Sequence, residues 1–367
     1  MRVIVVGGGA VGGFIGARLA LAGNEVALVG RPWLVEAVRT RGLRLIEPQQ
    51  EHLVQQGLSA APSVAEAAAQ GPFDLALLAV KTYDTATAVR EMQEAGLGSL
   101  QRVRFLVLQN GVGSEELLVQ AFGAERVIVA ALTQPVSVPE PGVVRLVKEK
   151  GGFALAPAAS GTGIEHVVTV FQEAGLRIRS YRNYQAVKWS KLPLNILGNT
   201  IPAILDMPPG EVYAHIGLLR LEIAAMRELM VVTRALEVRL VNLPGYPVRL
   251  LMWVLCNLPA PLLSPLMPRL VGSGRKGRMP SLQHGLARGR EVSEVAYLNG
   301  AVVRYGERVG VPTPANRLLT ETLEAIYARE YTRDEWHHRP ERLIEAWEWA
   351  ISGSVTPNAQ VQRRDAL

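Results

Sequence analysis

The residues best suited to chemistry in the second half of the chain are a lysine and two asparagines in an apolar segment. Lys191, Asn195 and Asn199 are spaced at i, i+4 and i+8 within residues 186–204. In one helix this spacing places all three on a single face, where polar groups are costly to bury unless something hydrogen-bonds them. A polar substrate would meet that need. The alternative is a solvated helix face, but asparagine is a poor helix former, so we favour a functional role.

A glycine-rich turn near the N-terminus predicts a dinucleotide site. Gly7, Gly9 and Gly12 form the pattern G-x-G-x-x-G directly after an apolar, strand-like stretch and at the start of a helical one. Gly7 permits the tight turn, Gly9 lets the backbone approach a pyrophosphate, and Gly12 lets the helix pack on the strand. The helix N-terminus, with Ala10 and Val11, would stabilise the anion. A purely structural glycine turn is the alternative.

Arg31 stands where an NAD-binding protein would carry an acidic residue. It follows the expected second strand, residues 25–29, and Gly30. An acidic side chain there would bind ribose hydroxyls, whereas a guanidinium can bind a 2′-phosphate bidentately. The sequence therefore favours NADP(H) over NAD, the alternative being an ordinary surface arginine.

Two further polar positions follow expected strands. Lys81 comes after the apolar run 75–80, and Asn110 with Gly111 comes after the run 105–108. Ligands of open α/β sheets bind outside the carboxyl ends of the strands, so both positions are candidate cofactor contacts. A solvated lysine and an ordinary Asn-Gly turn are the alternatives.

The elements that must position these residues indicate two domains. Short apolar runs alternate with helical patterns up to Gln172, which predicts an α/β Rossmann-type N-terminal domain with a mostly parallel sheet. Long helical patterns follow, including one interpreted as uninterrupted from Glu291 to Gly310, and predict an all-α C-terminal domain. We expect the domains at 1–180 and 181–350, with a tail at 351–367.

An apolar, proline-rich insert at 244–280 interrupts the helical domain. Its residues 250–268 carry no charge and are nearly numerous enough to span a bilayer. Four prolines break that segment, so we do not expect a single membrane-spanning helix and favour a helical hairpin, a lid or a homodimer surface, with contact to a membrane surface as the alternative.

Composition narrows the function further. The net charge of +6 comes from scattered basic residues, which favours small anionic ligands and argues against nucleic acid. Cys256 is the single cysteine, so an internal disulfide is excluded, and no histidine pattern indicates a metal site. No secretory signal pattern opens the chain, and we expect a cytoplasmic protein.

Together these motifs resemble the ketopantoate reductase family. The resemblance covers most of the chain and rests on the glycine turn with Arg31, K-T-Y-D-T from Lys81, Q-N-G-V-G from Gln109, K-W-S-K-L-P-L-N-I-L-G-N from Lys188, M-P-S-L-Q from Met279, S-E-V from Ser293, N-G-A-V-V from Asn299 and G-V-P-T-P from Gly310. It implies NADPH as the hydride donor, a Rossmann domain joined to an all-helical domain, and a substrate cleft between them.

The resemblance also implies residue roles. Lys191 would be the catalytic acid, with Glu294 completing the polar cluster. The side chains that would bind substrate are Asn110, Asn195, Asn199 and Ser281. Asn110 would contact both the cofactor and the substrate. Hydride addition to a keto carbon builds negative charge on its oxygen, which an ammonium can stabilise and protonate. To donate its proton repeatedly near neutral pH, Lys191 needs a lowered pKa, and we expect burial to lower it.

The expected activity is reduction of a 2-keto acid to a 2-hydroxy acid, with ketopantoate to pantoate, a step toward pantothenate and coenzyme A, as the leading candidate. Pro208-Pro209 replaces an asparagine that the family carries before the glycine now at Gly210, and the spacing from Gln283 to Glu294 is longer than the family pattern. Other 2-keto acids therefore stay open. The alternatives are a catalytically silent NADP-binding sensor and a related dehydrogenase with another substrate.

Overall fold

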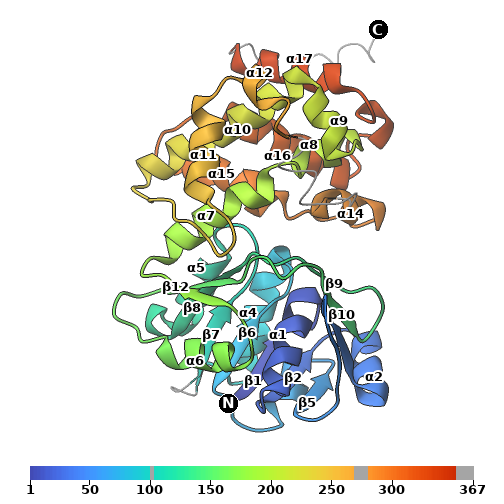
Figure 1. Ribbon diagram of the computed structural model, residues 1–367, viewed down its shortest axis with the longest axis vertical. Coiled ribbons are helices and arrows are strands. Elements are labelled where there is room, and N and C mark those ends of the chain that lie inside the picture. The colour runs from blue at the N-terminus through green and yellow to red at the C-terminus, as the bar shows by residue number, and fades with distance from the viewer. Residues whose placement is uncertain (100–102, 268–279, 353–367) are drawn as a thin grey trace. The chain divides into compact units, whose positions relative to one another are not determined.

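The computed structural model describes residues 1–99, 103–267 and 280–352 (Figure 1). The chain forms two compact units: Met1–Lys191 with Leu240–Pro247, and Leu192–Arg239 with Val248–Leu367. The boundary expected near residue 180 falls at the end of the last strand, inside the first unit. The functional assignment of the two domains stays a prediction.

The first unit is built on an eight-stranded sheet that contains the strands expected from the apolar runs, together with three strands, β5, β11 and β12, that were not expected. Its order is β12-β11-β8-β7-β6-β1-β2-β5, and every neighbouring pair is parallel except β8 and β11. The strands are β1 (Arg2–Val6), β2 (Glu25–Val29), β5 (Leu58–Ala61), β6 (Leu75–Leu78), β7 (Arg104–Val107), β8 (Val127–Leu132), β11 (Phe153–Pro157) and β12 (Ile178–Ser180). The expectation of a mostly parallel, Rossmann-type sheet is confirmed.

Helices cover both faces of this sheet because its strands are apolar on both sides. Along β1, Val3 and Val5 join one buried cluster with Phe14, while Ile4 and Val6 join the other. The helices of this unit are α1 (Ala10–Leu21), α2 (Pro32–Arg41), α3 (Val64–Ala68), α4 (Thr85–Glu94), α5 (Ser114–Phe122) and α6 (Glu165–Glu173), with single turns η1 (Thr82–Asp84) and η2 (Ala124–Arg126). The strand order reverses between β1 and β6, where such sheets bind ligands.

A second, four-stranded sheet lies beside α1 and was not expected from the sequence. Its order is β4-β3-β10-β9, from β3 (Leu43–Ile46), β4 (Glu51–Val54), β9 (Val136–Ser137) and β10 (Val143–Leu146). These strands are short and partly exposed, so they lack the continuous apolar runs of the main sheet.

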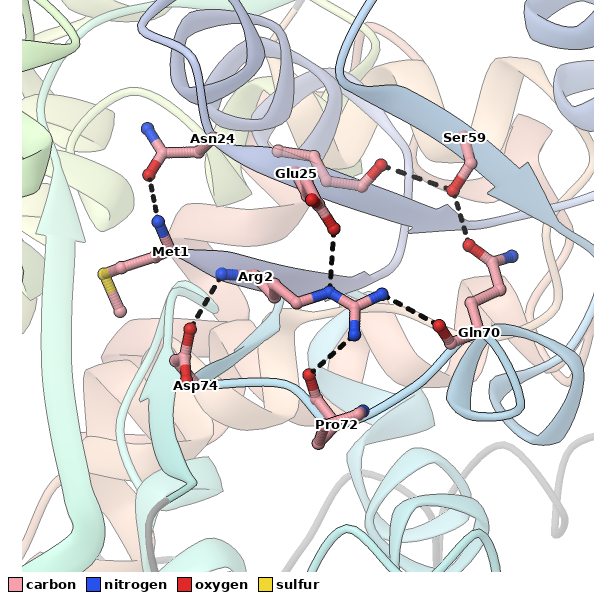
Figure 2. Close-up of polar contacts among 9 residues, drawn as sticks. Met1, Arg2, Asn24, Glu25, Ser59, Gln70, Pro72 and Asp74 are labelled. Atoms are coloured by element: carbon pink, nitrogen blue, oxygen red, sulfur yellow. Dashed lines mark hydrogen bonds and ion pairs between the residues drawn. The ribbon is translucent and has the colours of Figure 1, made fainter.

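A polar cluster holds the amino ends of β1 and β2 (Figure 2). The Arg2 guanidinium donates to the Glu25 carboxylate and to backbone carbonyls of the loop 70–72, while the Arg2 backbone N–H donates to Asp74. Surface pockets of about 420 and 250 Å³ in this region both include Ser59 in their walls. The glycine turn follows the opposite end of β1, so these pockets are not the predicted dinucleotide site.

The described part of the second unit is helical, as predicted. The 20-residue helix α10 packs against α9, α11, α12, α15, α16 and α17. The helices are α8 (Thr200–Leu205), α9 (Pro209–Ala214), α10 (Ile216–Ala235), α11 (Val248–Asn257), α12 (Ala260–Leu263), α14 (Ser281–Ala287), α15 (Asn299–Arg308), α16 (Pro314–Tyr327) and α17 (Pro340–Ile351), with turns η3 (Val295–Tyr297) and η4 (Arg333–Glu335). Helix α7 (Tyr184–Ile196) begins in the first unit and ends in the second.

The apolar segment of the insert folds as two short helices separated at Pro259. Helix α11 buries Met252 and exposes Leu250 and Trp253, by 59% and 57%. Over residues 1–99, 103–267 and 280–352, the structure contains no helix with the length and apolarity needed to cross a bilayer.

The predicted uninterrupted helix from Glu291 to Gly310 is wrong. The segment forms the turn η3, then Leu298 leaves helical geometry with φ −102° and ψ −98°, and α15 begins at Asn299. Asn299 is fully buried: its side chain accepts from Thr200 Oγ1 and donates to Asn316 Oδ1, at 2.6 and 3.0 Å. These bonds fix the first residue of α15 in the core, and apolar spacing does not reveal them.

Candidate active site

The glycine turn connects β1 to α1 in a backbone path that side chains would obstruct. Gly7 has φ +107°, and a Cβ there would lie 2.5 Å from Val80 N; a Cβ at Gly12 would lie 2.2 Å from the Gly7 carbonyl oxygen. A Cβ at Gly9 would meet no described atom within 4 Å. Gly7 and Gly12 thus serve internal packing, while Gly9 leaves open space before the N-terminus of α1, beside Ala10. This opening fits the approach of a pyrophosphate.

Arg31 lies just beyond the strand to which this turn is bonded. The N–H groups of Gly7 and Gly8 both donate to the Val29 carbonyl, at 3.1 and 2.8 Å. Arg31 precedes α2 and is exposed. Among the residues that the structure describes, none forms a hydrogen bond or ion pair with its guanidinium, which leaves it available to an anionic ligand.

The structure brings the loops that carry Lys81 and Asn110 into contact. Thr82 Oγ1 donates to the Asn110 carbonyl at 2.9 Å, and Gln109 Nε2 donates to Thr85 Oγ1 at 3.1 Å. Gly111 has φ +82°, which favours glycine at this point of the loop. Because β1, β2, β6 and β7 are parallel neighbours, the glycine turn, Arg31, Lys81 and Asn110 all follow the carboxyl ends of adjacent strands.

Lys191 has the most perturbed environment among the candidates. Burial lowers the pKa of its ammonium from the ordinary value of 10.5 to about 8, because a poorly hydrated site disfavours the charged form. The residue retains some accessible surface. Within the described part of the chain no hydrogen bond or ion pair compensates the ammonium. A lysine in this state can hold and release a proton close to neutral pH.

The prediction that Lys191, Asn195 and Asn199 share one helix face is wrong for Asn199. Helix α7 carries Lys191 and Asn195 but ends at Ile196. Gly198 then adopts φ +62°, and its N–H donates to the buried Glu222 carboxylate at 2.9 Å. Asn199 consequently stands at the N-cap position of the next helix, α8, where its side chain makes no capping hydrogen bond.

Asn199 and Ser281 meet within the second unit. Asn199 is 3% exposed, and its Nδ2 donates to Ser281 Oγ at 3.1 Å and to the Asn195 carbonyl at 2.9 Å. Its Oδ1 accepts the Leu282 N–H at 3.2 Å, which anchors the start of α14. Glu294 lies at the start of η3, half-buried. Met279, of the M-P-S-L-Q motif, lies outside the described residues.

A buried ion pair near Lys191 and Asn110, within the first unit, was not expected from the sequence. Lys188 Nζ lies 3.4 Å from Glu115 Oε2, with side chains only 2% and 3% exposed, and it donates to the Gln109 carbonyl at 2.8 Å. A lysine one turn before Lys191 in an apolar helix was the available signal, but its partner is distant in sequence and cannot be found from spacing.

Comparison with known proteins places the chain in a family. The ketopantoate reductase PanE/ApbA family matches residues 3–160, and its C-terminal region matches residues 183–327. A 2-dehydropantoate 2-reductase of Pyrococcus horikoshii is 26% identical over 327 residues, covering 89% of this chain and 97% of that protein.

Solved structures agree with this match. A PanE/ApbA family ketopantoate reductase from Ralstonia eutropha is 31% identical, with a TM-score of 0.75 over 90% of this chain and 99% of that one. D-mandelate dehydrogenase, solved with NADH and anilino(oxo)acetate, is 22% identical with a TM-score of 0.73 over 90% and 99% of the two chains, and shares the fold. Since both regions of the family match in chain order, this chain belongs to the ketopantoate reductase PanE/ApbA family.

Proposed function

We propose that the protein reduces a 2-keto acid to a 2-hydroxy acid with NADPH, and that ketopantoate is the leading substrate. Its family makes it an oxidoreductase acting on CH-OH groups and their keto counterparts. The observation that carries the proposal is Lys191, an ammonium whose pKa burial lowers to about 8. Such a group can protonate the developing alkoxide near neutral pH.

The proposed cofactor contacts follow from the open turn and its basic neighbours. When bound, the reduced nicotinamide supplies the hydride. The backbone at the start of α1 would bind the pyrophosphate and Arg31 the 2′-phosphate, with further contacts from the carboxyl ends of β6 and β7. The full proposed set is Gly7, Gly9, Ala10, Val11, Gly12, Arg31, Lys81, Asn110 and Gly111.

The proposed substrate contacts are amide and hydroxyl groups. Asn110, Asn195, Asn199 and Ser281 would bind the polar groups of the keto acid, and Glu294 would hold the geometry around Lys191. The hydrogen bond between Asn199 and Ser281 supports a joint role, because the two groups orient each other. Substrates lacking the matching polar groups would leave such amides unpaired, which disfavours their binding.

The Pro208-Pro209 pair is the reason to keep other 2-keto acids in view. It lies at the start of α9, directly before Gly210, where the family pattern predicts an asparagine. Proline has neither a backbone donor nor a side-chain amide, so a contact open to asparagine is lost. A different acyl group is therefore the second candidate for the same reaction.

A substrate screen tests the proposal. NADPH oxidation is followed by absorbance with ketopantoate and a series of other 2-keto acids, and each active substrate is repeated with NADH. We expect turnover with at least one 2-keto acid and a kcat/KM about tenfold or more higher with NADPH, the effect of one charge-assisted phosphate contact. Binding of NADPH without turnover of any keto acid would favour the catalytically silent sensor; turnover of another substrate class alone would favour the related dehydrogenase.

The cellular location, the pathway and the oligomeric state of the protein are also proposals. We place the protein in the cytoplasm, in the route to pantothenate and coenzyme A. The exposed Leu250 and Trp253 of α11 stay a candidate homodimer surface.

A further inference from the structure

Three segments of the first unit meet at one buried ammonium. Lys188, on α7, lies 3.4 Å from the carboxylate of Glu115 in the first turn of α5. The same Nζ donates to the backbone carbonyl of Gln109 at 2.8 Å, in the loop between β7 and α5. Both side chains of the ion pair are almost completely buried. The ammonium therefore connects α7, α5 and the loop that carries Asn110.

The loop is held from its other side as well. Thr82 Oγ1 donates to the carbonyl of Asn110, the residue directly after Gln109. Two consecutive carbonyls thus accept side-chain hydrogen bonds, one from Lys188 on α7 and one from the segment that follows β6. Because Gly111 comes next with φ +82°, the loop would otherwise have considerable conformational freedom.

Stability alone gives a weak reason for this arrangement. Removing two charges from water is costly, and an apolar pair of similar volume in place of a buried ion pair often leaves a protein equally stable or more so. The apolar pair cannot, however, donate to the Gln109 carbonyl. What the lysine adds to an apolar core is a directed hydrogen bond to the loop.

We propose that Lys188, paired with Glu115, is a positioning residue that fixes the loop 109–111 against α7, so that Asn110 and Gly111 hold their ligand-binding orientation. The role in ligand binding rests on the proposed function; the fixing of the loop does not. Lys188 acts through the loop and need not touch cofactor or substrate.

The test separates stability from positioning with four variants. Lys188→Met and Glu115→Leu each leave a buried charge without its partner, and the double variant removes both charges. Glu115→Gln retains Lys188 and its bond to Gln109. The control is Arg18→Met/Glu47→Leu, which removes a different ion pair of the same unit, one that is only partly buried and lies outside the candidate site.

We expect the double variant to regain the thermal stability that the two single Leu and Met variants lose. Its amides at 109–113 should nevertheless exchange hydrogen about tenfold faster than in the wild type, and its Kd for NADPH should be about tenfold higher. Glu115→Gln and the control should change the exchange rate at 109–113 and the Kd for NADPH much less. A double variant with wild-type exchange in this loop would overturn the inference, even if the single variants do not fold.

The two readouts also keep this inference apart from the proposed function. If the wild-type protein binds no NADPH, or binds it and reduces no 2-keto acid, the proposed reductase activity fails. Hydrogen exchange at residues 109–113, measured without any ligand, still decides whether Lys188 fixes the loop.

Discussion

Lys188 and Lys191 lie one turn apart on α7 and have opposite surroundings. Lys188 is 2% exposed, contacts the Glu115 carboxylate and donates to a backbone carbonyl. Lys191 is desolvated, and in the described part of the structure nothing of opposite charge or suitable polarity pairs with it, so its pKa falls to about 8. The same residue type on the same helix thus has a compensated charge at one position and an uncompensated charge at the other.

The difference shows what decides the use of a buried lysine. A carboxylate and a carbonyl stabilise the charged form, so a paired ammonium serves as a fixed donor that orients its partners. Desolvation without a partner disfavours the charged form, so an unpaired ammonium gives up its proton more readily. Helical spacing singled out Lys191 but not Lys188, and only the tertiary partners distinguish a lysine that positions a loop from one that donates a proton.

Of the changes considered, replacing Lys191, the lysine without a partner in the described residues, should have the largest effect on catalysis. In Lys191→Met, we expect kcat for the keto acid to fall about 10²–10⁴-fold, the usual contribution of a positioned proton donor. The Kd for NADPH should stay near the wild-type value, in contrast to Lys188→Met, where it should rise. Steady-state kinetics and nucleotide fluorescence measure the two quantities. If Lys191→Met keeps most of its kcat, Lys191 is not the acid.

The same substitution should stabilise the fold. Lowering the lysine pKa from 10.5 to about 8 by burial implies a cost on the order of 1–3 kcal/mol at neutral pH, the lower part of this range allowing for residual solvent access. A methionine of similar volume avoids that cost, so Lys191→Met should unfold at higher denaturant concentration than the wild type, and Lys188→Met at lower.

This stability difference should depend on pH. Between pH 8 and 10.5 the unfolded wild type still binds the Lys191 proton while the folded protein has lost it, so wild-type stability rises with pH relative to Lys191→Met. Urea titrations at pH 7 and 10 measure the change. A difference that is the same at both values would show that Lys191 is not desolvated in the folded protein.

Much of the fold could be predicted from the sequence because its determinants are local. The glycine turn requires particular backbone angles and close packing, which only glycine satisfies at Gly7 and Gly12. Apolar runs predicted the central strands β1, β2, β6, β7 and β8 of the main sheet, since a parallel sheet buried on both faces needs continuous apolar residues. The second sheet was not predicted because its short strands are partly exposed and lack continuous apolar runs.

The errors arose where tertiary hydrogen bonds decide the backbone. Just after α7 ends, the Gly198 N–H donates to Glu222, and where α15 begins the Asn299 side chain is bonded to Thr200 and Asn316. In both places the apolar spacing continues through the break. Periodicity shows which face is buried, but it does not show which polar partner a buried asparagine will find.

The pH dependence of catalysis should distinguish the two lysines most directly, although the expected change in kcat/KM is only about tenfold per pH unit. With an acid of pKa about 8, the kcat/KM for keto acid reduction should be constant below that pH and fall about tenfold per pH unit above it. A lysine in water would keep the rate constant up to pH 10. Glu115→Gln leaves Lys191 and its surroundings on α7 in place, so its profile should keep the wild-type midpoint. A midpoint that moves with Glu115→Gln, or one near 10, would assign proton donation to a group other than an isolated, desolvated Lys191.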